Sequence, residues 1–150
     1  MRTAVALLLA LSLGAPFADR ALAADLLMAR SERAFPEAMA LLQDAIASRG
    51  YTITRLQQVN ENLERSHYRS DLYRVVFFGK HAEVRRLAAD YPMLIPFLPL
   101  QVTIFAEGDQ AIVVAADPLV FAHLYPDPAL RPVFETWARD LRAILDAVRE

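Results

Sequence analysis

The stretch LQVTIFAEGDQAIVVAA, residues 100–116, contains the clearest structural signal in the sequence. Two runs rich in β-branched and aromatic residues flank the triplet Glu107-Gly108-Asp109. Such runs are typical of β-strands. Glycine adopts the positive φ angle that a tight hairpin requires without steric cost. The sequence therefore predicts a β-hairpin that turns at Gly108.

Three segments precede this hairpin. The apolar run LYRVVFFG, residues 72–79, predicts an interior strand. Residues 81–90 repeat apolar side chains at helical spacing, and Pro92 follows, so a helix is expected there. The segment PMLIPFLP, residues 92–99, is apolar and interrupted by prolines. A proline inside a helix costs about 3 kcal/mol, so this segment is predicted to be a buried extended connection.

A long helix is predicted after the hairpin. Residues 119–123 suggest a short helical turn, and the proline-rich loop YPDPALRP, residues 125–132, follows it. Beyond this loop, apolar residues recur at close to 3.6 residues per turn, as on a helix that covers a sheet. They are Val133, Phe134, Trp137, Leu141, Ile144, Leu145 and Val148. The charged residues Arg139, Asp140, Arg142 and Asp146 are assigned to the opposite, polar face.

The first half of the chain predicts two more strands and one more helix. Residues 25–30 and 51–59 have strand character, and residues 35–50 place apolar side chains on one helical stripe. The segment NENLERSH, residues 60–67, is interpreted as a polar loop. The full order is β-α-β-β-α-β-β-α. This order predicts an α+β domain in which an antiparallel sheet carries its helices on one face.

The order of these elements resembles the bacterial and archaeal family known as domain of unknown function 302. The matching features are Tyr73-Arg74-Val75, Pro99-Leu100, the turn at Gly108 and Asp117-Pro118, and the similarity extends over about residues 27–149. The resemblance implies a small fold related to the TATA-binding-protein-like sheet and a tendency to form dimers. It implies no activity. The chain has Lys80-His81 where many members have Asn-Pro.

The N-terminal 23 residues have the layout of a secretory signal peptide. Arg2 precedes an apolar run from Ala4 to Leu13, and Ala21-Leu22-Ala23 offers small residues at a cleavage site. The apolar run is about half of the roughly 20 residues that cross a bilayer as a helix. The sequence predicts export to the periplasm and one mature domain, residues 24–150. A leader retained as a membrane anchor is the alternative.

The composition excludes several functional classes. The chain has no cysteine, which rules out a thiol nucleophile, a cysteine-ligated metal site and c-type haem attachment. The formal net charge is −2, and removal of the leader, which holds Arg2, Asp19 and Arg20, makes the charge more negative. Nucleic acid is therefore not expected as a partner.

The segment SHYRSDLYR, residues 66–74, has two interpretations. In the first, His67, Tyr68 and Arg69 are solvated loop residues, and Tyr73 and Arg74 point to opposite sides of a strand. In the second, the five residues bind a ligand. His67, Arg69 and Arg74 would then surround a small anion, because arginine side chains bind carboxylates and phosphates well. Lys80 and His81 would lie about 20 Å from Arg74 along the extended strand. They are therefore too far away to bind the same small ion as Arg74.

A metal or haem site built from His67, His81 and His123, with Met28, Met39 or Met93, is another alternative. The histidines do not have the spacing of ligands on one helix, so no cofactor and no metal are expected. No hydrolase or phosphate-loop motif is present, and no catalytic residue is assigned. The leading hypothesis is a non-enzymatic, homodimeric binding or interaction module. Its open sheet face or proline connection would contact a partner or an apolar ligand. The alternative is an anion-binding enzyme or cofactor carrier.

Overall fold

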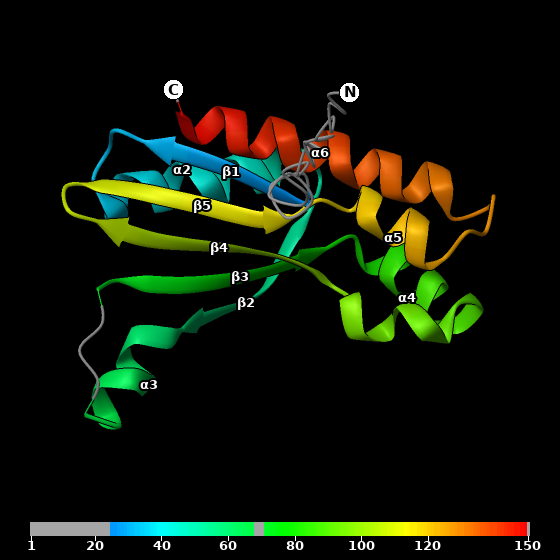
Figure 1. Ribbon diagram of the computed structural model, residues 1–150, viewed down its shortest axis with the longest axis horizontal. Helices are drawn as coiled ribbons and strands as arrows, with labels where there is room; N and C mark the ends of the chain where they lie inside the picture. The colour runs from blue at the N-terminus through cyan, green and yellow to red at the C-terminus, as the bar shows by residue number, and fades with distance from the viewer. Residues whose placement is uncertain (1–24, 68–70, 150) are drawn as a thin grey trace, which may run out of the picture.

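The computed structural model describes residues 25–67 and 71–149 of the chain (Figure 1). Five strands form one antiparallel sheet in the order β1-β5-β4-β3-β2. The strands are β1 (Leu26–Ser31), β2 (Thr52–Gln58), β3 (Tyr73–Gly79), β4 (Leu100–Glu107) and β5 (Gln110–Ala116). The predicted hairpin is confirmed as β4 and β5, and its turn residue Gly108 has a φ of 60°.

Two long helices cover one face of the sheet. They are α2 (Phe35–Ser48), which connects the two edge strands, and α6 (Arg131–Arg149). Both helices lie behind the sheet in Figure 1, and α6 packs against β1 and α2. Their apolar stripes and the facing strand residues form the core. The core includes Leu42, Ile46, Val76, Phe78, Val102, Ile104, Val113, Phe134 and Ile144. The predicted α+β class, with its helices on one face, is confirmed.

Three short helical segments gather beyond one end of the strands (Figure 1). They are α4 (His81–Asp90), the 3-10 helix η1 (Pro92–Phe97) and α5 (Leu119–Leu124). Gly79 lets α4 turn back closely, because a Cβ at this position would lie only 2.8 Å from a methyl group of Val84. Asp117 holds the start of α5, since its carboxylate accepts a hydrogen bond from the Leu119 amide and pairs with Arg142.

Two sequence predictions about local structure were wrong. The segment assigned to a polar loop forms α3 (Val59–Arg65), whose Asn60 is buried and accepts a hydrogen bond from Arg74. The proline connection is the helix η1 instead of an extended segment, and its Met93 and Ile95 are exposed. Proline is compatible with the first turn of a helix, and a short 3-10 helix needs few amide donors. His123, in the predicted short helical turn, is an exposed residue of α5.

Candidate functional site

The described members of the predicted polar group, His67, Tyr73 and Arg74, do not lie together at one point. His67 is exposed after the end of α3, and Tyr68 and Arg69 lie outside the described residues. Tyr73 points to the open face of the sheet beside its β4 partner Phe105. Arg74 points to the opposite, helix-covered face. The three described members therefore have three different environments.

The Arg74 side chain contacts other groups of the protein. Its guanidinium donates hydrogen bonds to the Asn60 side chain and to the Tyr73 carbonyl oxygen, the latter at 3.1 Å. The same group lies 5.9 Å from the centre of the Phe35 ring at the start of α2. Because these contacts occupy Arg74, it connects α2, α3 and β3 and is not presented to a ligand.

An apolar pocket of about 320 Å³ lies where the sheet meets η1 and α5. Strand residues Phe77, Leu100, Gln101 and Ala116 form one side. The other side is formed by Pro96, Phe97, Leu98, Pro99, Pro118, Phe121 and Leu141. Among the described residues of this lining, Gln101 is the only one with a polar side chain. Small-molecule sites start at about 300 Å³ and are lined mainly by apolar and aromatic side chains. The pocket is therefore the leading candidate for a ligand site.

A series of aromatic rings connects this pocket to the single tryptophan. Phe97 in the pocket wall lies 4.7 Å from Phe121 between ring centres. Phe121 lies 5.8 Å from Phe134, which in turn lies 5.8 Å from Trp137. Trp137 is buried and donates a hydrogen bond to Glu83 at 3.0 Å. Its fluorescence should respond to a ligand that displaces the Phe97–Phe121 wall.

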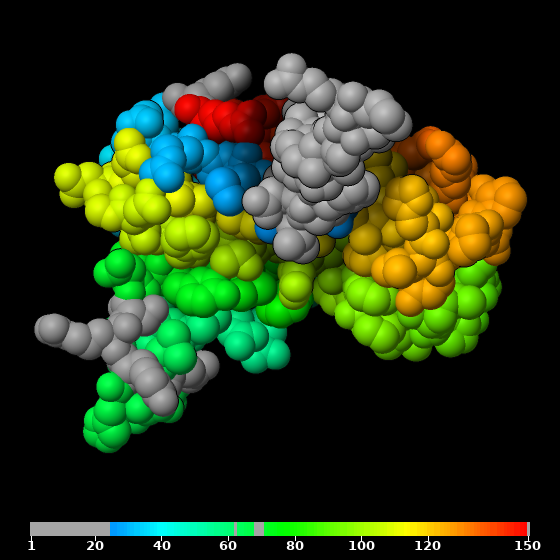
Figure 2. All heavy atoms as spheres, viewed as in Figure 1, coloured from blue at the N-terminus to red at the C-terminus, as the bar shows by residue number. Residues whose placement is uncertain are grey.

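The sheet face opposite α2 and α6 is apolar, and no helix of the described residues lies across it (Figure 1). In the same view, Figure 2 shows side chains of β3, β4 and β5 at the molecular surface. Leu26 and Met28 on this face are 50% and 53% exposed. The half-buried apolar residues beside them are Tyr73, Val75, Phe77, Phe105 and Val114. An apolar surface of this kind is typical of a contact area.

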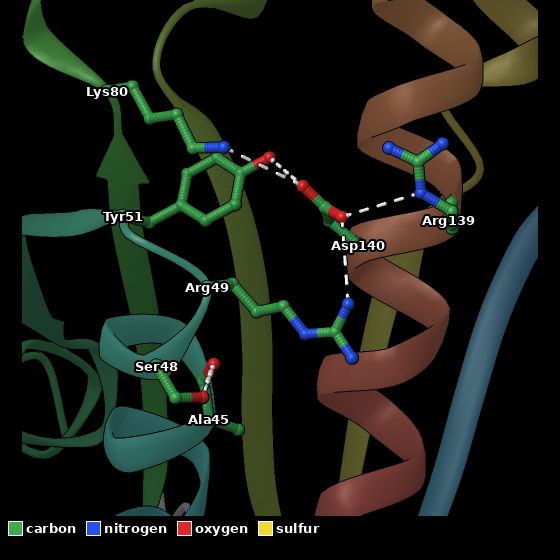
Figure 3. Close-up of polar contacts among 7 residues, drawn as sticks. All are labelled: Ala45, Ser48, Arg49, Tyr51, Lys80, Arg139 and Asp140. Carbon is green, nitrogen blue, oxygen red and sulfur yellow. Dashed lines mark hydrogen bonds and ion pairs between the residues drawn. The ribbon is translucent and has the colours of Figure 1, made fainter.

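A cluster of charged residues surrounds Asp140 on the helix-covered side (Figure 3). The Tyr51 hydroxyl donates a hydrogen bond to Oδ2 of Asp140 at 2.9 Å. Lys80 Nζ lies 3.8 Å from Oδ2, and Arg49 Nη1 and Arg139 Nε lie 3.7 and 3.8 Å from Oδ1. The cluster connects the end of α2, the β3–α4 junction and α6. A carboxylate buried to this extent needs such partners to remain charged.

The Tyr51 ring forms the floor of this cluster. It packs edge-on against Phe78 at 5.4 Å, and Lys80 Nζ lies 4.3 Å above its centre. Burial raises the pKa of the Tyr51 hydroxyl above its usual range, and the hydrogen bond to the negatively charged Asp140 raises it further. Tyr51 therefore remains a neutral hydrogen-bond donor at physiological pH.

The model of one protein family, domain of unknown function DUF302, matches residues 28–148. The chain belongs to this family. The crystal structure of an uncharacterized conserved DUF302 protein from Bacillus stearothermophilus has the same fold, with a TM-score of 0.75 and 18% sequence identity. The similarity covers 83% of this chain and 98% of the other. Among proteins of curated function, none is significantly similar to the chain.

Metal-binding clusters and membrane-spanning helices are both absent from the described residues of this DUF302 chain. In residues 25–67 and 71–149, no group of three or more histidine, aspartate or glutamate side chains is placed to hold a metal ion. His67, His81 and His123 lie on separate segments. No helix within these ranges is long and apolar enough to cross a membrane.

Sequence reasoning located the apolar pocket only in part, as an apolar ligand at the proline connection, and missed the charged cluster around Asp140. The pocket depends on η1, which was predicted to be extended. Asp140 was assigned to the polar face of the last helix, although it is buried. A signal was present, because Asp140 is three residues after Trp137 and four before Ile144, at the edge of the apolar stripe. A charged residue at such a position indicates a buried ion pair.

Proposed function

We propose that this DUF302 protein is an exported, non-enzymatic binding module that holds an apolar ligand in the pocket between the sheet and η1. The observation that carries the proposal is the lining, whose described residues include one polar side chain, Gln101. Apolar pockets with few polar groups are typical of small-molecule sites. The aromatic wall of Phe97 and Phe121 favours a ligand with an aromatic or branched apolar part.

Titration with the apolar fluorophore N-phenyl-1-naphthylamine tests this function. Saturable fluorescence enhancement is expected, together with a change in Trp137 emission. Ala116→Asp places a charge in the lining at an exposed position and should weaken binding at least about tenfold, because a charge in an apolar site is costly. The matched control is Ala129→Asp, an exposed alanine outside the pocket. Absence of saturable binding, or equal binding by both variants, would contradict the proposal.

Export is a separate part of the proposal and rests on the N-terminal sequence pattern. The mature protein should begin at or within a few residues of Ala24 and be released from cells by osmotic shock. N-terminal sequencing of the released protein provides the measurement. Recovery of a chain that still starts with Met1 in the membrane fraction would show that the leader is retained.

A second copy of the chain is the partner we propose for the open sheet face. The exposed Leu26 and Met28 continue into the apolar side chains of the central strands, so the described side chains in the middle of this face carry no charge. A partner with an uncharged apolar surface matches it, and a second copy provides one. The dimerisation implied by the family resemblance agrees with this pairing.

A further inference from the structure

The cluster around Asp140 has more positive than negative charge. Arg49, Lys80 and Arg139 come from three different elements and converge on one carboxylate. Glu83 is the other carboxylate that acts on Tyr51, and it accepts the hydrogen bond from Trp137. Among the described residues, three cations therefore face two carboxylates, on a chain whose formal net charge is −2. The positive charge is local and is not a property of the whole surface.

The three cations also retain unused hydrogen-bond donors. Their nitrogen atoms lie 3.7 to 3.8 Å from the Asp140 oxygens, which is beyond the usual hydrogen-bond distance. Among the described residues, no hydrogen bond is found from any of the three side chains to another protein group. Asp140 thus attracts the cations without satisfying their donors.

The cluster is rigid at its base and open to solvent at its rim. The Asp140 side chain is only 11% exposed, and Tyr51 is fixed against Phe78. The side chains of Lys80, Arg49 and Arg139 are 38%, 40% and 69% exposed, so a small ion can reach them. The first turn of α4, which starts directly after Lys80 and has no side-chain cap, adds a partial positive charge.

We propose that Arg49, Lys80 and Arg139 form a binding site for a phosphate group. Arginine and lysine donors from several directions match the tetrahedral oxygens of phosphate, and a dianion is better suited than a carboxylate to three converging cations. Asp140 and Tyr51 position the cations and do not contact the phosphate group. The site shares no residue with the apolar pocket and does not depend on the function proposed for that pocket.

Isothermal titration calorimetry with inorganic phosphate at constant ionic strength tests this site. Saturable binding is expected. Arg49→Gln and Arg139→Gln should each weaken binding about tenfold or more, because each removes a charge-assisted hydrogen bond. The matched control is Arg131→Gln. Arg131 lies on α6, as Arg139 does, and pairs with Glu135 away from the cluster. The affinity of this control should stay within about twofold of the wild type.

A second arm identifies the source of the phosphate group. Vesicles of phosphatidic acid in phosphatidylcholine, which present a phosphomonoester, replace inorganic phosphate, and co-sedimentation is measured for the same variants. The site is supported if either probe binds and if Arg49→Gln and Arg139→Gln weaken that binding. The probe that binds shows whether the phosphate group belongs to a soluble ion or to a lipid headgroup. Thermal unfolding confirms that the variants are folded. Arg139 is the most exposed of the three cations, so its substitution should disturb the fold least. Failure to bind both probes, or an equal loss in Arg131→Gln, would overturn the proposal.

Discussion

Val113 and Val114 are adjacent and chemically identical, yet they lie on opposite faces of β5. Val113 is fully buried beneath the helices, opposite Ala29 and Ile104. Val114 is half-buried on the open face, opposite Met28 and Thr103. The local sequence pattern is apolar on both sides, so the difference arises from where α2 and α6 pack. An apolar strand residue alone therefore does not show which face belongs to the core.

The largest loss of stability is expected from a charged side chain on the helix-covered face of the sheet. Val113→Asp should destabilise the domain by more than about 4 kcal/mol, because it buries an unpaired carboxylate. Val114→Asp should cost less than about 1 kcal/mol at protein concentrations where the wild type is also monomeric, since the carboxylate reaches water. Urea unfolding followed by Trp137 fluorescence measures both. Similar losses in the two variants would show that the open face is also part of the core.

The same pair of variants tests the proposed dimer. At micromolar concentration, sedimentation equilibrium should give a dimer for the wild type and a folded monomer for Val114→Asp, because the charge would be buried in the interface. A monomeric wild type without a co-purifying ligand would refute the pairing. The open face would then have to be covered by the chain itself.

The predictable parts of this fold depend on short-range patterns. The turn at Gly108 and the limits of α4 follow from residues that are neighbours in the sequence. In contrast, α3 depends on Asn60, whose side chain bonds with Arg74 fourteen residues later. The charged cluster depends on the approach of Tyr51 and Asp140, which are 89 residues apart. A single sequence does not show which distant residues the fold brings into contact. The polar contacts of Asn60 with Arg74 and of Tyr51 with Asp140 were therefore not predicted.

The charged cluster on the covered side predicts a pH-dependent effect. Tyr51→Phe should lower the free energy of unfolding by about 2 kcal/mol at pH 7, because Asp140 loses its direct hydrogen bond. The pKa of Tyr51 is raised in the folded protein, so its stabilising contribution is present below about pH 10 and is lost at higher pH. The stability curves of wild type and variant should therefore converge in alkali. Urea unfolding at several pH values tests this, and a constant gap up to pH 11 would contradict it.

Arg74 should have a smaller effect, because it lies at the margin of the covered face. Arg74→Ala removes the hydrogen bond to Asn60 and the contact with Phe35, at an expected cost of about 1 to 2 kcal/mol. The matched control is Arg85→Ala on the exposed surface of α4, which should change the stability by less than about 0.5 kcal/mol. Equal effects in thermal unfolding would show that the contacts of Arg74 contribute nothing specific.

The smallest effect is expected at His67, outside both faces of the sheet. His67 is exposed and has a φ of 65°, a conformation that side chains with a Cβ disfavour. His67→Ala should change the stability by less than about 1 kcal/mol, and the same is expected for Arg69→Ala from its sequence context. His67→Gly should raise the stability by up to about 1 kcal/mol, since glycine accepts this conformation without strain. Thermal unfolding of the three variants provides the measurement. A loss of several kcal/mol in either alanine variant would mean that His67 or Arg69 has buried partners, and it would restore residues 66–74 as a candidate ligand site.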